Sequence, residues 1–209
     1  MKKLVICFKA ERKGNMLVER KWKEEMNTDL KRGDWCQTFS GRQFWPLDPR
    51  PEDICILDIA YALSKTCRFN GHCRKFYSVA EHSYIVSFHV PDEFALWGLL
   101  HDASEAYVGD IPRPMKQLDA FKCIKAIEAN VMKVIVEFFD LHPGVEPKEV
   151  KMIDQALLAD EKVQIMAQEP AEWYLPQQAL GVDLQCWNPE EAVEKFLDRF
   201  FTLYRKKYN

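Results

Sequence analysis

Phe94-Ala-Leu-Trp-Gly-Leu-Leu-His-Asp-Ala-Ser-Glu-Ala106 is the stretch that decides the fold of this chain. Its apolar residues recur at the spacing of a helix that buries one face, and the polar pair His101-Asp102 follows directly after the most apolar part. We predict a helix that begins at Pro91, runs through this stretch and is ended by Gly109. A buried aspartate is costly unless it is paired or bound to a metal ion, so this helix also carries the first candidate for chemistry.

Helical patterns continue on both sides of this stretch. Ser78-Val-Ala-Glu81 has the form of a capping box, in which the serine hydroxyl accepts from the backbone N–H of the glutamate and the glutamate side chain returns to the backbone N–H of the serine. Asn188 followed by Pro189 predicts the start of the last helix. The helices expected besides the central one are Pro51–Ser64, Ser78–His89, Leu118–Leu141, Pro147–Gln168 and Asn188–Arg205.

The segment before these helices predicts a small β hairpin. Two short aromatic runs, Trp35–Phe39 and Arg42–Trp45, flank Ser40-Gly41, a dipeptide typical of a turn. The first 33 residues differ from the rest, because they hold ten Lys and Arg against five Asp and Glu with little apolar periodicity. We therefore predict a basic N-terminal extension over residues 1–34 and one all-α domain over residues 35–209, with the short hairpin at its start.

The composition excludes several classes of protein. The 209 residues are 47% hydrophobic and 29% charged with a net charge of −3, which is typical of a folded domain without a general attraction to nucleic acid. No apolar run approaches the roughly 18 residues of a membrane span. Seven cysteines without a CxxC pair indicate reduced thiols, and Cys67 and Cys73 beside His72 lack the second pair of a structural zinc site. We expect a cytoplasmic protein that binds neither a membrane nor nucleic acid.

The residues around His101 form a candidate metal site. Glu105 follows His101 by four positions and Asp102 by three, which places all three on one rim of the predicted helix. His82 lies in the middle of the neighbouring helix and can reach the pair from there. An HD dipeptide alone is a weak signal, but the helical context and the upstream histidine strengthen it.

A fourth ligand would come from the predicted helix of residues 147–168. Asp154 and Asp160 are both candidates, and each shares its helical face with apolar residues. Val150 and Leu157 accompany Asp154, whereas Ala156 is among the neighbours of Asp160. Periodicity alone therefore leaves the choice between the two carboxylates open.

Several motifs follow one another in a fixed order between Thr38 and Gln168. They are Cys67-Arg-Phe-Asn-Gly-His72, Phe76-Tyr-Ser-Val-Ala-Glu-His82, Leu99-Leu-His-Asp-Ala-Ser-Glu-Ala-Tyr107, Gly109-Asp-Ile-Pro-Arg-Pro-Met-Lys116, Val150-Lys-Met-Ile-Asp154 and Leu158-Ala-Asp-Glu161. In this order they resemble the HD-domain metal-dependent phosphohydrolases, and within that family the bacterial and phage group related to 5′-deoxynucleotidases. The resemblance implies an HD-domain helical fold for residues 35–209, and it is more specific for the fold and the metal site than for the substrate.

The resemblance also implies a metal centre. It assigns a divalent metal to four side chains, His82, His101, Asp102 and Asp154. Asp154 is favoured over Asp160, because the family places its aspartate shortly after Val-Lys and before Leu-Ala-x-Glu. Two imidazoles and two carboxylates suit Mn²⁺, Co²⁺, Fe²⁺ or Zn²⁺ better than an all-oxygen Mg²⁺ site. A second ion such as Mg²⁺ could bind beside Glu105.

Catalysis and phosphate binding are assigned by the same resemblance. Glu105 is expected to be the catalytic acid or base that orients the attacking water or protonates the leaving oxygen. Arg68 and Lys116 are expected to neutralise phosphate charge. The structural alternatives are a salt bridge for Arg68 and an ordinary surface position for Lys116.

Three further residues are candidates for substrate binding. Asp110 would approach the sugar hydroxyl, with a turn cap as the alternative. Phe69 would pack on the sugar or the base. His72 has two interpretations of equal weight, a residue that lines the pocket and a residue that closes a turn.

The activity expected from these residues is metal-dependent removal of the 5′ phosphate of deoxynucleotides, with dNMP as the main substrate and dNDP or dNTP as further ones. One alternative is hydrolysis of another phosphate ester, such as an alarmone or a cyclic dinucleotide. A second alternative is a regulator that binds nucleotides without hydrolysing them. The expected partner is a small-molecule nucleotide, and the termini outside the resemblance could form the interface of a homo-oligomer, since members of the family often self-associate.

Overall fold

The chain is mostly helical and opens with a two-stranded antiparallel hairpin, which confirms the predicted fold class. The computed structural model describes residues 32–208, so the predicted basic extension lies almost entirely outside the described residues. The strands and α-helices are β1 Cys36–Gln37, β2 Gln43–Phe44, α3 Ile56–Lys65, α4 Val79–His89, α5 Ala95–Leu100, α6 Glu105–Val108, α7 Arg113–Lys116, α8 Lys122–Phe139, α9 Lys148–Ile165 and α10 Pro189–Tyr208. Short 3₁₀ turns are η1 Pro51–Asp53, η2 Arg68–Gly71, η3 Asp92–Phe94 and η4 Asp119–Phe121.

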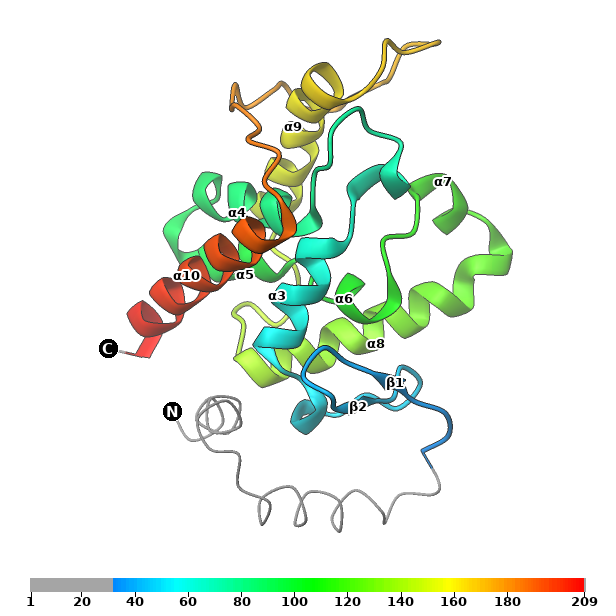
Figure 1. Cartoon of the computed structure of the whole chain (residues 1–209), viewed down its shortest axis with the longest axis vertical. Coiled ribbons are helices and arrows are strands. Elements are labelled where there is room, and N and C mark those ends of the chain that lie inside the picture. The colour runs from blue at the N-terminus through cyan, green and yellow to red at the C-terminus, as the bar shows by residue number, and fades with distance from the viewer. Residues whose placement is uncertain (1–31, 209) are drawn as a thin grey trace.

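The arrangement places α3 near the middle of the molecule, with the hairpin at one end of the view and α9 at the other (Figure 1). Helices α4 and α10 both pack on α3, and α10 also contacts α4 and α5. The core between them is apolar and includes the fully buried side chains of Ile59, Leu63, Leu99, Phe196 and Phe200. Within residues 32–208, no helix is long and apolar enough to cross a membrane.

The hairpin forms where its sequence predicts it. Strands β1 and β2 pair antiparallel, and Gly41 in the connection has a φ of 79°, which a residue with a side chain rarely adopts. The buried carboxylate of Asp58 on α3 accepts from both the backbone N–H and the hydroxyl of Ser40, at 2.6 and 2.9 Å. These two bonds fasten the turn to the central helix.

The helix expected over residues 51–64 is divided into η1 and α3. Ile54 and Cys55 between them are extended, with ψ angles of 131° and 128°. The carboxylate of Asp53 accepts from the backbone N–H of Arg50 at the start of η1 and pairs with the guanidinium of Arg32. The prediction of a continuous helix is therefore wrong between η1 and α3, where the extended backbone of two residues interrupts it.

A close approach of α4 to α5 brings the two candidate histidines together. A Cβ atom at Gly98 would lie 3.1 Å from the Cα atom of Ser87, so only glycine fits without a shift. The interface brings His82, the fourth residue of α4, close to His101, which directly follows α5. The glycine in the apolar run therefore has a packing role.

The helix expected from Pro91 to Ala106 is interrupted at the residues that carry the chemistry. Helix α5 ends at Leu100, and the next four residues form tight turns in which Ala103 N–H donates to the Leu100 carbonyl. The side chain of His101 takes the carbonyl of Gly98 as its acceptor. His101 and Asp102 therefore lie in a turn rather than inside a helix, while the predicted stop at Gly109 is confirmed as the end of α6.

The capping box at the start of α4 is only half formed. Ser78 Oγ accepts from the backbone N–H of Glu81 at 3.1 Å, as predicted. The carboxylate of Glu81 instead accepts from three backbone N–H groups of residues 185–187, at 2.7–2.9 Å. This buried glutamate therefore holds the segment that precedes α10, which the local pattern could not reveal.

The remaining helices agree with their predicted places and differ at their ends. Helix α8 begins at Lys122 after η4, α9 ends at Ile165, and α10 extends to Tyr208. Asn188 caps α10, since its side-chain oxygen accepts from the backbone N–H of Glu191 at 2.9 Å. In addition, the six cysteines in the described part of the chain are free thiols.

Candidate metal site

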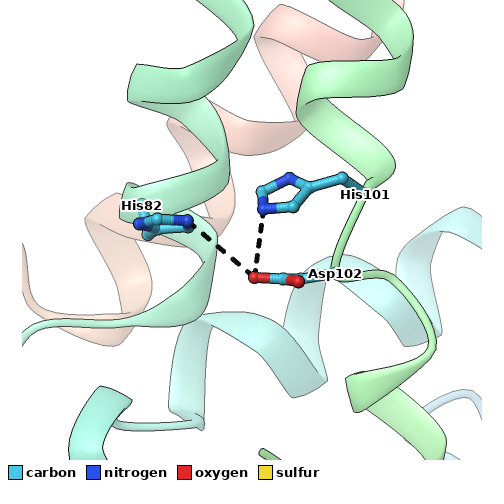
Figure 2. Close-up of side chains that lie close together, drawn as sticks. All are labelled: His82, His101 and Asp102. Atoms are coloured by element: carbon cyan, nitrogen blue, oxygen red, sulfur yellow. Dashed lines mark ion pairs between the residues drawn. The ribbon is translucent and has the colours of Figure 1, made fainter. Parts of the chain in front are cut away.

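Three side chains converge where α4 meets the turn after α5. The ligand atoms of His82, His101 and Asp102 all lie within 4.8 Å of one another, so the group could hold a metal ion. Asp102 Oδ2 lies 3.2 Å from His101 Nε2 and 3.9 Å from His82 Nε2. Figure 2 shows both imidazole rings directed toward this one carboxylate.

Both histidines have their other ring nitrogen already engaged. His101 Nδ1 lies 2.8 Å from the carbonyl of Gly98, and His82 Nδ1 lies 2.7 Å from Oε1 of Glu161. A carbonyl and a carboxylate accept hydrogen bonds, so the proton belongs on Nδ1 in each ring. The two Nε2 atoms are buried and make no hydrogen bond among the described residues.

This arrangement fits a cation. With the first proton of each ring on Nδ1, the lone pairs of both Nε2 atoms are directed toward Oδ2 of Asp102, and these acceptors repel one another unless a proton or a metal ion lies between them. A divalent ion, for which imidazole nitrogen and carboxylate oxygen are ordinary ligands, would satisfy all of them at once. The chemistry of the donor set therefore supports a divalent metal.

Asp154 and Asp160, between which periodicity could not decide, have different surroundings. Asp154 Oδ1 lies 3.1 Å from His82 Nε2. It therefore borders the group of His82, His101 and Asp102 without being a member of it. Both oxygens of Asp160 are used elsewhere, because they accept from the backbone N–H groups of Leu180, Gly181 and Val182 at 2.7, 2.9 and 3.2 Å. The geometry places Asp154 at the site and leaves Asp160 with a structural role.

Negative charge dominates this group of residues in the absence of a cation. Burial disfavours a charged imidazole, yet Asp102 and Asp154 raise the pKa of His101 to about 10. Burial also opposes ionisation of Asp102, but His101, His82 and Arg68 lower its pKa well below the ordinary value. The site therefore attracts positive charge, whether as protons or as a metal ion.

Glu105 lies beside this group as the first residue of α6. Its side chain is only 7% exposed, and Oε2 makes no hydrogen bond within residues 32–208. Burial raises the pKa of Glu105 to about 10, and the neighbouring charges of Asp102 and Asp110 act in the same direction. The carboxyl group therefore holds a proton at neutral pH and can donate it.

Arg68 is committed to two carboxylates of the site. Its guanidinium lies 2.9 Å from Oε2 of Glu161 and 3.7 Å from Oδ2 of Asp102, and its side chain is only 13% exposed. Arg68 thus forms the salt bridge that was its structural alternative, and its role in neutralising phosphate charge stays a prediction. Phe69, the next residue, has a left-handed backbone with a φ of 54°, and its ring lies 6.4 Å from that of Trp173.

The other predicted substrate residues differ in burial and in their hydrogen-bond partners. Asp110 is partly buried, which raises its pKa, while the charge of Arg68 opposes that change. Lys116 Nζ donates to Oε1 of Glu128 at 2.7 Å and so has a partner of its own. His72 has an exposed side chain, and its backbone N–H donates to the carbonyl of Phe69 and closes the turn.

Three residues around the site, Glu161, Glu146 and Trp173, have no role that was predicted from the sequence. Glu161 bonds to His82, and it follows Asp154 by seven positions, which is two helical turns and the same face. This spacing could have indicated that Glu161 faces the site together with Asp154. Burial raises the pKa of Glu146, and the charges of His101 and Asp154 also act on that pKa. The ring of Trp173 lies 6.4 Å from that of Phe69. Glu146 and Trp173 both come from segments without regular structure, where periodicity carries no information.

Comparison with known proteins places the chain among bacterial relatives, although no protein-family model matches it. It is 42% identical over 169 residues to Uncharacterized protein YfdR of Escherichia coli (strain K12), covering 78% of this chain and 92% of the relative. It is also 41% identical over 91 residues to Uncharacterized protein RCAP_rcc00048 of Rhodobacter capsulatus, covering 39% of this chain and 46% of that protein. Since the match to YfdR extends over nearly all of that protein, the chain belongs to the same family as YfdR.

Proposed function

We propose that this protein is an HD-domain phosphohydrolase, a cytoplasmic metal-dependent enzyme that removes the 5′ phosphate of deoxynucleotides. The proposal depends on one observation above all. Two imidazoles with free Nε2 atoms meet the carboxylate of Asp102 beside the buried carboxyl group of Glu105. This pairing of a cation site with a proton donor is what hydrolysis of a phosphate ester requires.

His82, His101, Asp102 and Asp154 would hold the metal, with Mn²⁺, Co²⁺, Fe²⁺ or Zn²⁺ as the ions that suit two nitrogens and two carboxylates. A divalent ion bound there would lower the pKa of a water molecule and take up negative charge from the phosphate. The metal would be partly shielded from solvent, since the side chain of His82 is fully buried and that of Asp154 is 37% exposed.

Glu105 acts as the general acid. Its proton is held in a buried position next to Asp102, and the unpaired Oε2 can reach a substrate oxygen without first breaking a hydrogen bond. Donation of this proton to the leaving 5′ oxygen lets the nucleoside depart as a neutral alcohol. The ionised carboxylate that remains can then accept a proton from water and return to its starting state.

Binding of the nucleotide falls to residues around this centre. Lys116 and Asp110 lie within the electrostatic reach of Glu105, where Lys116 offers a positive charge to the phosphate and Asp110 an acceptor to the sugar hydroxyl. The ring of Phe69 packs on the sugar or base. Arg68 contributes its charge from its place between Glu161 and Asp102.

The test is phosphate release from ribo- and deoxyribonucleoside mono-, di- and triphosphates by metal-free protein supplied with Mn²⁺ or Co²⁺, and by the same protein with a chelator. We expect release from deoxynucleoside monophosphates that the chelator abolishes. Release from another phosphate ester only would contradict the nucleotide substrate. Absence of bound metal together with absence of hydrolysis would refute the enzyme and favour a binding protein.

A further inference from the structure

We propose that Glu161 is a positioning residue that keeps the proton of His82 on Nδ1, so that Nε2 presents its lone pair to the metal site. The inference rests on the proposed metal site and assigns a task to a residue outside the ligand set. Glu161 is fully buried on α9, and its Oε1 lies 2.7 Å from His82 Nδ1. A carboxylate at this distance accepts the Nδ1–H hydrogen bond and disfavours the tautomer that is protonated at Nε2.

The charge of Glu161 is compensated within the protein. A buried carboxylate is costly unless it is paired, and Arg68 provides the partner at 2.9 Å. The same guanidinium lies 3.7 Å from Asp102, which in turn lies 3.9 Å from His82 Nε2. The four side chains therefore form a closed ring around one edge of the site, in which moving Glu161 would disturb both a ligand and its counter-charge.

The other histidine shows why a side chain is needed here. The Nδ1 atom of His101 is held by the backbone carbonyl of Gly98, three residues earlier on the same turn. His82 is the fourth residue of α4, and its Nδ1 atom has as its partner Glu161 on α9, 79 positions later in the chain. Glu161 on α9 thus provides the acceptor for Nδ1 of His82, as the local backbone carbonyl provides the acceptor for Nδ1 of His101.

Glu161→Gln is the variant that tests this role, because it keeps the size of the side chain and removes its charge. Asp58→Asn is the matched control, since Asp58 is also a buried carboxylate with hydrogen-bond partners, but it holds the hairpin turn through Ser40. Thermal unfolding of both metal-free variants shows whether each remains folded. Mn²⁺ binding is measured by electron paramagnetic resonance of the free ion.

We expect Glu161→Gln to bind Mn²⁺ about ten- to a hundredfold more weakly than the wild type, and Asp58→Asn to bind it with wild-type affinity. In ¹⁵N-labelled wild-type protein loaded with diamagnetic Zn²⁺, the ring of His82 should carry its proton on Nδ1 and none on Nε2. The wild-type measurement needs no mutation, so it tests the role even if Glu161→Gln does not fold.

The outcomes separate this inference from the proposed function. Equal Mn²⁺ affinity of wild type and Glu161→Gln, or a wild-type His82 ring protonated at Nε2, overturns the positioning role and leaves the metal site standing. Failure of the wild-type protein to bind Mn²⁺, Co²⁺, Fe²⁺ or Zn²⁺ refutes the metal site itself, and the positioning role falls with it.

Discussion

The two aspartates of α9 provide a sharp test of the site, because Asp154→Asn and Asp160→Asn make the same chemical change six residues apart. Asp154 lies 3.1 Å from His82 Nε2 and contacts the candidate metal site. Asp160 is almost fully buried and holds the backbone of residues 180–182. We expect the first variant to lose metal binding and the second to lose stability.

The expected magnitude for Asp160→Asn follows from its three hydrogen bonds. Hydrogen bonds to a charged group contribute about 1.5–3 kcal/mol each. Asparagine keeps one acceptor oxygen and turns an NH₂ group toward one backbone N–H, so one bond is lost and one donor is left unpaired. The free energy of unfolding should fall by about 2–4 kcal/mol, which corresponds to a drop in melting temperature of roughly 5–15 °C for a chain of this length.

For Asp154→Asn the expected effect is on the metal. Removing a partner of a ligand weakens metal binding about ten- to a hundredfold, so removing a ligand itself should cost at least about a hundredfold. The side chain is 37% exposed, and its loss relieves repulsion with Asp102 while it removes attraction to His82. The metal-free variant should therefore unfold within about 1 kcal/mol of the wild type.

Both quantities can be measured on the same samples. Calorimetric titration of metal-free protein with Mn²⁺ gives the affinity, and thermal unfolding with a chelator present gives the stability. A pattern in which Asp160→Asn loses Mn²⁺ affinity at unchanged stability, while Asp154→Asn binds as tightly as the wild type, would refute the assignment of Asp154 to the site.

Three other outcomes are expected. Glu105→Gln should lower kcat for phosphate release by about 10²–10⁴-fold with little change in Mn²⁺ affinity, and wild-type activity in this variant would exclude the general-acid role. The metal-free protein should lose stability as pH rises from about 6.5 to about 10, because folding raises the pKa of His101 and of Glu105 to about 10. The folded state then binds more protons than the unfolded state in this window, and urea unfolding that shows constant or rising stability there would contradict the argument. Phe196→Ala should lower the free energy of unfolding by about 3–5 kcal/mol in urea, since this ring of α10 is fully buried in the core, and a loss under 1 kcal/mol would show that the core there is loosely packed.

The parts of the fold that the sequence predicted are those with local causes. The turn at Ser40-Gly41 and the cap at Asn188 depend on backbone groups within a few residues, and both formed. The helix through Trp97 was placed correctly over Ala95–Leu100, a run of six residues without a polar side chain that are all buried. Its continuation past Leu100 was not, since the side chain of His101 competes for the carbonyl of Gly98 and periodicity does not register such a bond.

The hydrogen-bond partners of the buried glutamates and aspartates could not be predicted from the sequence. Glu81 had the right spacing for a complete capping box, and Asp160 had a face as apolar as that of Asp154. Each of the two instead accepts hydrogen bonds from the segment of residues 180–187, which returns across α4 and α9. Periodicity does not distinguish a carboxylate that binds metal from one that anchors distant backbone, and Asp154 was favoured over Asp160 only through the resemblance to a known family.

By itself the sequence determined the helical fold with its hairpin, the cap residues, and the pair His101-Asp102 with His82 as candidates for one site. These follow from side-chain periodicity and from hydrogen bonds between near neighbours, which any short stretch carries with it. Only the tertiary structure decided which carboxylates lie beside the imidazoles, that Arg68 pairs with Glu161, and that Glu161 holds His82. Those outcomes depend on distances between segments that lie far apart in the chain, and such distances exist only once α4, α5 and α9 have packed together.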